Sequence, residues 1–268
     1  YTGAVTLNTS TTLTAASDTI TFSSTVNAAD TTDKDLTFGS GTGTVTFTGA
    51  VGAVSTNLGT ITNIASQTLI FADAVTATTI ANYGTLLFNA TSAKTISSNI
   101  TDNGTTVLQV INSADNAPGI ITFSGNIVAD TITIGTTANA GSALFNGTVT
   151  HSDTSNINIV GGDHADEDSL ANFANTVTVT AITLDDNTGD ATATFSGSSK
   201  TITGTINGVG TTEGTVTVTG TPTFASAIGT SQVLALIDID NTTVFNEEIR
   251  ATNINVAASK TATAKKAI

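Results

Sequence analysis

The sequence predicts an all-β protein, a right-handed parallel β-helix (β-solenoid) with turns of roughly 20–25 residues. Two observations lead to this prediction. A phenylalanine recurs in one local frame along nearly the whole chain of 268 residues, and apolar residues alternate with small polar ones around it. A period of two is typical of strands that bury one face, so each repeat would add short strands to a continuous core.

A Thr-rich strand that ends in phenylalanine opens each repeat, as in TITF, TVTF and TATF, and four residues later comes Val, Ile or Ser. Threonine is β-branched and polar, which suits the solvent face of a strand and leaves the ring for the core. The eleventh phenylalanine, Phe38, keeps the strand but then enters the glycine turn GSGTG. The ten in the frame are expected to be core residues: Phe22, Phe47, Phe71, Phe88, Phe123, Phe145, Phe173, Phe195, Phe224 and Phe245.

Small residues two positions after the ring predict corners, where the chain turns into the next strand. These are Gly49, Gly125, Gly147, Asn175 and Gly197. Alternating stretches downstream, such as VTATTI (75–80) and VTVTAITL (177–184), supply the next strands. We therefore expect three short strands per turn that pair with the turns above and below at about 4.8 Å, and eleven turns roughly 50 Å long in which equivalent phenylalanines stack.

The domain boundaries follow from composition. Residues 1–259 are predicted to form the solenoid, and 260–268, with three of the six lysines, a boundary or linker segment. DEDSLANFA (166–174) is the one stretch in which we expect a turn or two of helix. Tandem immunoglobulin-like sandwiches remain an alternative, although they usually carry a buried Trp and a Tyr corner. An up-and-down barrel would need longer strands.

Charge limits the partners. The net charge is −14 and Arg250 is the only arginine, which argues against nucleic acid and anionic lipid. No apolar run approaches the ~18 residues of a membrane span. The absence of Cys excludes disulfides and thiol chemistry, and suits a protein that is exported unfolded and is stable without cross-links. The chain opens at Tyr1 without a basic, apolar leader, which we interpret as a removed signal peptide or a fragment.

Catalytic patterns are weak, and the sequence predicts no enzyme. His151 and His164 are interpreted as surface residues in polar loops, and no G-x-S-x-G elbow occurs. The glycine-rich segments 39–44 and 208–214 do not open a helix, as a phosphate loop would. An extracellular carbohydrate-active β-helix enzyme is a third alternative for the function, but it would need paired acids in an aromatic cleft.

Calcium is the one metal that the sequence favours, because oxygen ligands crowded on flexible loops suit Ca²⁺. LDDNTGD (184–190) and GGDHADED (161–168) are the two main loops concerned, and IDIDN (237–241) supplies two further aspartates, Asp238 and Asp240. The first loop lacks the D-x-D-x-D-G run with a trailing Glu that is typical of a calcium-binding loop. The second lacks the G-x-D continuation of a calcium-binding nonapeptide. The candidate ligands are Asp163, Asp166, Asp168, Asp185, Asp186, Asn187 and Asp190.

The stretches ITFSGNIVADTITIG (121–135) and ALFNGTVT (143–150) resemble passenger regions of bacterial autotransporters and filamentous-haemagglutinin-type adhesins. The Thr/Ala-rich background, with ATSAKTISSNI (90–100), is also similar to bacterial S-layer proteins. The first resemblance implies a non-enzymatic structural or adhesive scaffold in a surface fibre or layer, with self-association and a host or cell-surface glycan or protein as partners. The second implies a calcium-dependent S-layer lattice protein.

Overall fold

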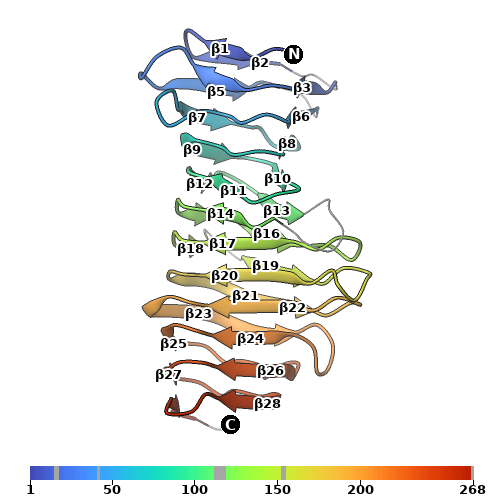
Figure 1. Cartoon of the computed structure of the whole chain (residues 1–268), viewed down its shortest axis with the longest axis vertical. Coiled ribbons are helices and arrows are strands. Elements are labelled where there is room, and N and C mark those ends of the chain that lie inside the picture. The colour runs from blue at the N-terminus through green and yellow to red at the C-terminus, as the bar shows by residue number, and fades with distance from the viewer. Residues whose placement is uncertain (15–17, 41–42, 112–118, 152–154, 267–268) are drawn as a thin grey trace.

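The structure, a computed structural model, describes residues 1–14, 18–40, 43–111, 119–151 and 155–266. Within these ranges all regular structure is β-strand, and no helix forms. The strands pair in parallel and stack as a solenoid of about 11 turns with roughly 23 residues each. Figure 1 shows the turns piled along one axis, with the N-terminus at one end and the C-terminus at the other. The predicted all-β solenoid is thus confirmed.

Each turn has three faces, which the strand pairing defines. The first face consists of β3 (Ile20–Phe22), β6 (Thr44–Phe47), β8 (Thr68–Phe71), β10 (Thr85–Asn89), β13 (Val107–Ile111), β16 (Thr131–Ile134), β19 (Asn156–Val160) and the C-terminal parts of β21 (Val177–Asp185) and β23 (Ser198–Gly208). The second face consists of β1 (Val5–Leu7), β4 (Val26–Ala28), β11 (Lys94–Ile96), β14 (Ile121–Phe123), β17 (Ser142–Phe145), β20 (Ser169–Phe173), β22 (Ala191–Phe195), β24 (Thr215–Val218), β26 (Leu234–Ile239) and β28 (Ala251–Val256).

The third face completes the turn. It consists of β2 (Thr11–Leu13), β5 (Lys34–Phe38), β7 (Leu58–Thr62), β9 (Ala77–Asn82), β12 (Asn99–Asp102), β15 (Ile127–Val128), β18 (Val149–Thr150), the N-terminal parts of β21 and β23, β25 (Thr221–Phe224), β27 (Thr243–Phe245) and β29 (Ala262–Ala264). Because β21 and β23 run around a corner, the first and third faces join into one 19-stranded sheet.

All eleven phenylalanines are at most 1% exposed, which confirms that they are core residues. The ten rings of the repeated frame touch one after another, with centroids 4.9–5.4 Å apart. That spacing is close to the distance between paired strands, so each turn brings its ring against the ring of the previous turn. The rings form one column through the solenoid.

The column changes face twice, which the expectation of simple stacking on equivalents did not include. Phe22 to Phe88 lie on the first face, Phe123 to Phe195 on the second, and Phe224 and Phe245 on the third. At both changes the stacked geometry gives way to an edge contact, with interplanar angles of 87° between Phe88 and Phe123 and 85° between Phe195 and Phe224. Both geometries are favourable for aromatic pairs, so contact continues through each change.

Aliphatic side chains occupy the inward positions that the rings leave. On the first face Val110 follows Phe88, and on the third face Ile202 precedes Phe224 in direct register. The core cross-section therefore combines one ring with aliphatic groups from the other faces over most of its length. The second turn is an exception, because Phe38 on the third face makes an edge contact with Phe47 on the first, with ring centroids 6.0 Å apart.

The small residues after the rings lie at corners, as predicted, and the structure gives the reason. A Cβ on Gly125 would lie 2.2 Å from the Ser98 carbonyl oxygen, and one on Gly147 would lie 2.1 Å from the Gly125 oxygen. Close approach to the previous turn thus requires glycine there, rather than a left-handed backbone. Asn175 instead donates its amide to the Asn146 carbonyl oxygen at 3.1 Å.

The helix expected within 166–174 was wrong. Ser169–Phe173 forms β20, in which residues alternate between buried and half-buried and pair with β17 and β22. Pairing on both sides outweighs the local preference of a short polar segment. In the expected boundary segment 260–268, β29 pairs with β27; the assignment of that segment as a boundary stays a prediction.

Truncating a ring inside the column should strongly destabilise the protein. Phe173→Ala removes a fully buried ring stacked on Phe145 and Phe195, so we expect a loss of about 3–5 kcal/mol in the free energy of unfolding. Urea denaturation followed by circular dichroism measures it. Thr217→Ala, at an outward position of β24, is the control and should change stability by less than about 0.5 kcal/mol. Equal effects of the two variants would contradict the column as the main source of stability.

Candidate functional site

The acidic corner consists of Asp185, the last residue of β21, and the loops 161–168, 186–190 and 209–214, which link the first face to the second in three consecutive turns. The two loops singled out in the sequence are therefore neighbours. Thr188 and Gly189 both donate their backbone N–H to the Gly162 carbonyl oxygen, at 3.1 and 3.0 Å. The Asp190 N–H donates to Asp168 Oδ1 at 2.9 Å. Backbone contacts thus hold the first two loops against each other.

Carboxylates of this corner accept hydrogen bonds from backbone groups. Asp186 Oδ1 accepts from the Ala191 N–H and Oδ2 from the Gly214 N–H, both at 2.7 Å, so this side chain ties its own loop to the next. Glu167 is only 3% exposed, and its Oε2 accepts from the His164 N–H at 3.3 Å. These acids satisfy N–H groups that the turns leave without strand partners.

Negative charge accumulates at the acidic corner. Burial raises the pKa of the Asp185 carboxyl, and the Glu213 and Asp186 carboxylates raise it further. Burial also raises the pKa of Asp190, with Asp168 and Asp186 adding to the effect. Like charges on three adjacent loops therefore oppose ionisation of two carboxyl groups. The hydrogen bonds between the loops therefore hold the acidic corner together against the repulsion between its carboxylates.

Some predicted ligands lie away from this centre. Asp163 and Asp166 are exposed, and Asp163 Oδ1 lies 3.8 Å from His164 Nε2. Asn187 turns its amide to the Thr137 carbonyl oxygen at 3.1 Å. Among the residues that the structure describes, no three Asp, Glu or His side chains converge as metal ligands. Calcium binding by Asp163, Asp166, Asp168, Asp185, Asp186, Asn187 and Asp190 stays a prediction.

Removing one charge from the acidic corner should stabilise the metal-free protein. Because the folded-state pKa of Asp185 is raised, its ionised form opposes folding above that pKa, and the penalty fades as pH falls toward 3.8. In EDTA at pH 7, Asp185→Asn should gain up to about 0.5 kcal/mol, or about 1–2 °C in Tm, with no gain near pH 3. Asp238→Asn on β26, outside the corner, is the control for the same charge change.

The same variants test calcium. If the corner binds Ca²⁺, millimolar CaCl₂ will raise the Tm of the wild-type protein, because a ligand that binds only the folded state stabilises it. Asp185→Asn and Asp190→Asn should then lose that rise, whereas Asp238→Asn should keep it. A melting temperature that is the same in CaCl₂ and in EDTA would contradict the calcium hypothesis and leave the carboxylates with their structural hydrogen bonds.

Of the other sequence candidates, His164 and the segment 208–214 belong to the acidic corner, and His151 and the segment 39–44 lie apart from it. His164 is exposed, as expected, but His151 is half-buried, and its Nδ1 has no hydrogen-bond partner among the described residues. The glycine-rich segment 208–214 forms a corner of the solenoid. Residues 41–42 of the segment 39–44 lie outside the described residues.

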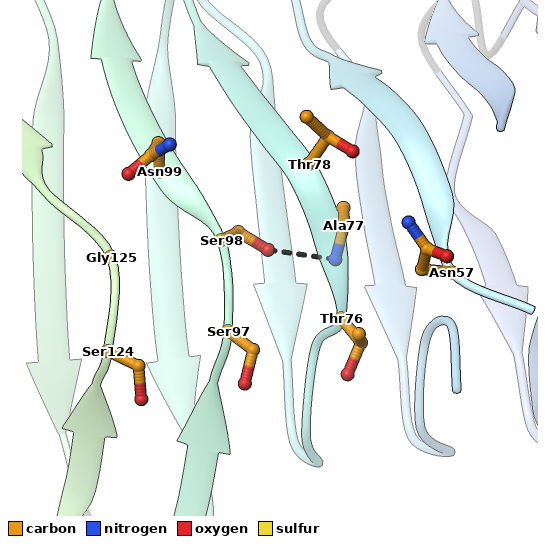
Figure 2. A pocket seen from close by; sticks show the side chains of 9 residues that line it. All are labelled: Asn57, Thr76, Ala77, Thr78, Ser97, Ser98, Asn99, Ser124 and Gly125. Atoms are coloured by element: carbon orange, nitrogen blue, oxygen red, sulfur yellow. Dashed lines mark hydrogen bonds between the residues drawn. The ribbon is translucent and has the colours of Figure 1, made fainter. Parts of the chain in front are cut away.

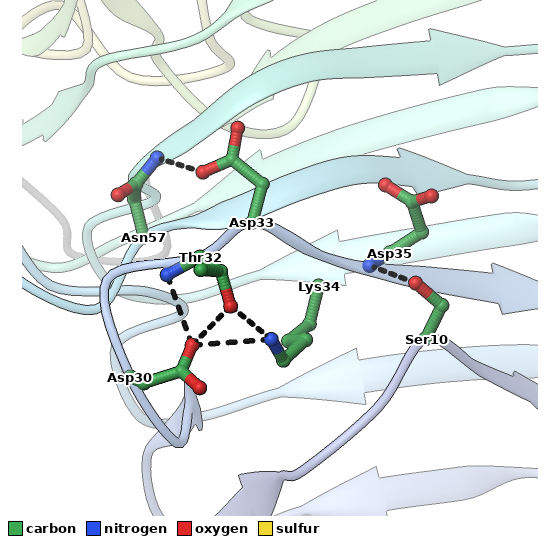
Figure 3. A network of polar contacts seen from close by, with 7 residues as sticks. All are labelled: Ser10, Asp30, Thr32, Asp33, Lys34, Asp35 and Asn57. Atoms are coloured by element: carbon green, nitrogen blue, oxygen red, sulfur yellow. Dashed lines mark hydrogen bonds and ion pairs between the residues drawn. The ribbon is translucent and has the colours of Figure 1, made fainter.

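A polar network occupies the second turn, at the corner between the second and third faces (Figure 3). Thr32 donates from its hydroxyl and its backbone N–H to Asp30 Oδ1, and Lys34 Nζ pairs with the same oxygen at 3.1 Å. These contacts, those of Thr32 first, lower the pKa of Asp30 to about 2. Asp33 accepts from the Asn57 amide at 3.1 Å and so connects this turn to the next one.

Two hollows lie at corners of the solenoid. The first, about 340 Å³, crosses several turns and is lined by Asn57, Thr76, Ala77, Thr78, Ser97, Ser98, Asn99, Ser124 and Gly125. Figure 2 shows Thr76, Ser97 and Ser124 side by side on successive turns, and Ser98 Oγ accepts from the Ala77 N–H at 3.0 Å. The second, about 430 Å³, is lined by residues of three consecutive corners, Tyr83 among them. Sequence reasoning missed both, because a hollow depends on how successive corners superpose.

Comparisons with known proteins add no family. No family model matches the sequence, and no curated protein or solved structure matches it significantly. No helix in the described ranges is long and apolar enough to cross a membrane. The function must therefore be argued from the geometry of this chain.

Proposed function

We propose that this chain is a non-enzymatic structural protein of the bacterial cell surface, a secreted scaffold within a fibre or layer of stacked solenoids. The unpaired strand edges of its first and last turns carry the proposal. In the described part of the chain, β1 and β2 pair only with the following turn, and β28 and β29 only with the preceding one. The outer edge of β3 is covered by Tyr1, whose N–H group donates to the Thr21 carbonyl oxygen and whose carbonyl oxygen accepts from the Ser23 N–H. Free parallel edges favour addition of a further turn. Either a flanking segment of a longer chain or a neighbouring copy can supply that turn, and we assign the role to a neighbouring copy.

Charge supports head-to-tail contact between copies. The early turns carry exposed carboxylates at Asp18, Asp30, Asp33 and Asp35. Four of the chain's seven basic residues lie in the last turns, at Arg250, Lys260, Lys265 and Lys266. The segments around Asp33 and Lys260 both connect the second face to the third, so they share one corner of the coil. Arg250 pairs with Glu248 and Lys266 with Glu247 in the same turns, so Lys260 and Lys265 are the cations that favour one polarity of stacking.

The surface also supports a scaffold. Outward positions of the strands are mostly Thr, Asn and Ser, as in the row Asn172, Thr194 and Thr217, which are paired in direct register. Such a surface is polar without being strongly basic, which suits a protein that meets its partners outside the cell. An autotransporter or filamentous-haemagglutinin-like passenger is the finer identity that we favour, with host or cell-surface glycans or proteins as partners.

A calcium-dependent S-layer lattice protein is the second candidate. The acidic corner favours it, because carboxylates repel one another on three stacked loops and a divalent cation would relieve that repulsion. Calcium-dependent assembly of purified protein into sheets, seen by electron microscopy, would support the lattice. Linear fibres that form equally well in EDTA would support the first candidate instead.

End-to-end assembly gives a direct test. Purified protein should form particles whose length grows with concentration, measured by sedimentation velocity and electron microscopy. Lys260→Glu/Lys265→Glu reverses charge at the last turns, so it should weaken assembly about tenfold or more at low salt, with a smaller difference at high salt. Lys200→Glu, on β23 and inside the stack, is the control for charge reversal away from the ends. Monodisperse single particles at all concentrations would contradict the proposal.

A further inference from the structure

We propose that the hollow around Tyr83 binds a neutral saccharide. The inference rests on the proposed surface function and names the class of ligand that the surface would hold. The hollow, about 430 Å³, lies between the third and first faces and is formed by residues from three consecutive turns. Its volume falls within the range of ligand sites, which combine an apolar or aromatic surface with a few polar groups.

Tyr83 is an unusual aromatic residue in this protein. The eleven phenylalanines are buried, and Tyr1, the only other tyrosine, stacks on Phe22 with centroids 5.0 Å apart. Tyr83 belongs to no ring pair of the column and leaves 40% of its surface exposed, at a hollow. An exposed ring beside hydrogen-bonding groups is suited to the apolar C–H face of a sugar.

Buried amides fix the backbone beneath the ring. The Tyr83 N–H donates to Asn63 Oδ1 at 2.7 Å, and Asn63 Nδ2 donates to Asn82 Oδ1 at 2.8 Å. Asn82 Oδ1 also accepts from the Gly84 N–H at 3.1 Å. Both asparagines have no exposed surface. A satisfied buried polar pair holds its neighbours rigidly, so Tyr83 is presented in a preorganised corner.

Close packing shapes the same corner. A Cβ on Gly84 would lie 2.5 Å from the Gln67 carbonyl oxygen and 2.7 Å from that of Ile64, so the chain next to Tyr83 admits only glycine. Ser66, which also lines the hollow, adopts a left-handed φ of 65°, a strained conformation for serine. Neighbouring Gln67 is fully buried, and its amide atoms have no partner among the described residues.

The lining decides the class of ligand. Besides Tyr83 it offers the hydroxyls of Ser66, Thr85 and Thr105 and the amide of Asn103, and no lining residue is charged. Hydroxyls and amides match the alternating donors and acceptors of a sugar. The net charge of −14 disfavours uronic or sulfated sugars. A neutral hexose or N-acetylhexosamine, one or two rings long, is the ligand that fits.

The two tyrosines make the test direct. Protein labelled with 3-fluorotyrosine gives two fluorine signals, from Tyr1 and Tyr83, which Tyr83→Phe assigns. We would titrate lactose, cellobiose, maltose and N,N′-diacetylchitobiose, with digalacturonic acid as the charged comparison. At least one neutral disaccharide should shift the Tyr83 signal in a saturable way and leave the Tyr1 signal unchanged.

Substitutions inside and outside the hollow test whether the sugar binds there. Tyr83→Ala should weaken binding of that disaccharide at least tenfold in calorimetry, and Asn103→Ala should weaken it as well. Tyr1→Ala and Ser97→Ala, the latter in the first hollow, should bind normally. Because Tyr83 is partly exposed, Tyr83→Ala should melt like the wild-type protein, which checks that the corner has kept its fold.

Several outcomes would overturn the inference. They are the absence of a shift with all four neutral sugars, binding unaffected by Tyr83→Ala, and a shift only with digalacturonic acid. A shift of the Tyr83 signal only with a Thr/Ser-rich peptide would assign the hollow to protein instead. Tyr83→Ala should assemble normally, so failure of sugar binding with intact assembly rejects this site alone. Failure of assembly with intact binding rejects only the stacked scaffold.

Discussion

The contact between successive phenylalanine rings is the interaction on which the rest of this solenoid depends. Parallel pairing sets the turns about 4.8 Å apart, and the rings of the column lie 4.9–5.4 Å apart, so one spacing satisfies hydrogen bonds and core together. A turn that lost its ring would leave a gap that neither neighbour could fill without breaking strand pairing. Backbone and core therefore constrain each other at every level, and aliphatic residues on the remaining faces complete each layer.

Because the core and the strand pairing occupy the faces of the solenoid, we expect functional groups to lie at its corners. Inward positions are occupied by the core, and outward strand positions are limited to side chains that suit a flat paired surface. Corners accept extra residues, carboxylates and an exposed ring, because a loop there does not interrupt pairing. The acidic corner and the hollow at Tyr83 lie on different edges of the coil. Each is built by superposing loops of consecutive turns, so neither exists within a single repeat.

The extent of sequence prediction follows from the same geometry. The burial of Phe22 or Phe195 and the corner at Gly125 could be predicted, because a local frame of a few residues determines them. The change of face after Phe88 could not, since it depends on how many residues complete a turn. Proximity of the loops at Asp168 and Asp190 also needed the register of stacked turns. No sequence pattern indicated the hollow at Tyr83, because the hydrogen bonds that fix this corner join Asn63 and Asn82, which are buried and lie one turn apart.

The two changes of face in the ring column mean that the sequence repeat and the geometric turn are separate periods. The motif of phenylalanine, corner and aliphatic residue serves at all three corners: Phe47 precedes the second face, Phe145 the third and Phe224 the first. Duplicated or deleted segments therefore need not be whole turns, since a surplus of one third of a turn only rotates the column to the next face. Such a gene could lengthen or shorten its rod in small steps and keep a closed core throughout.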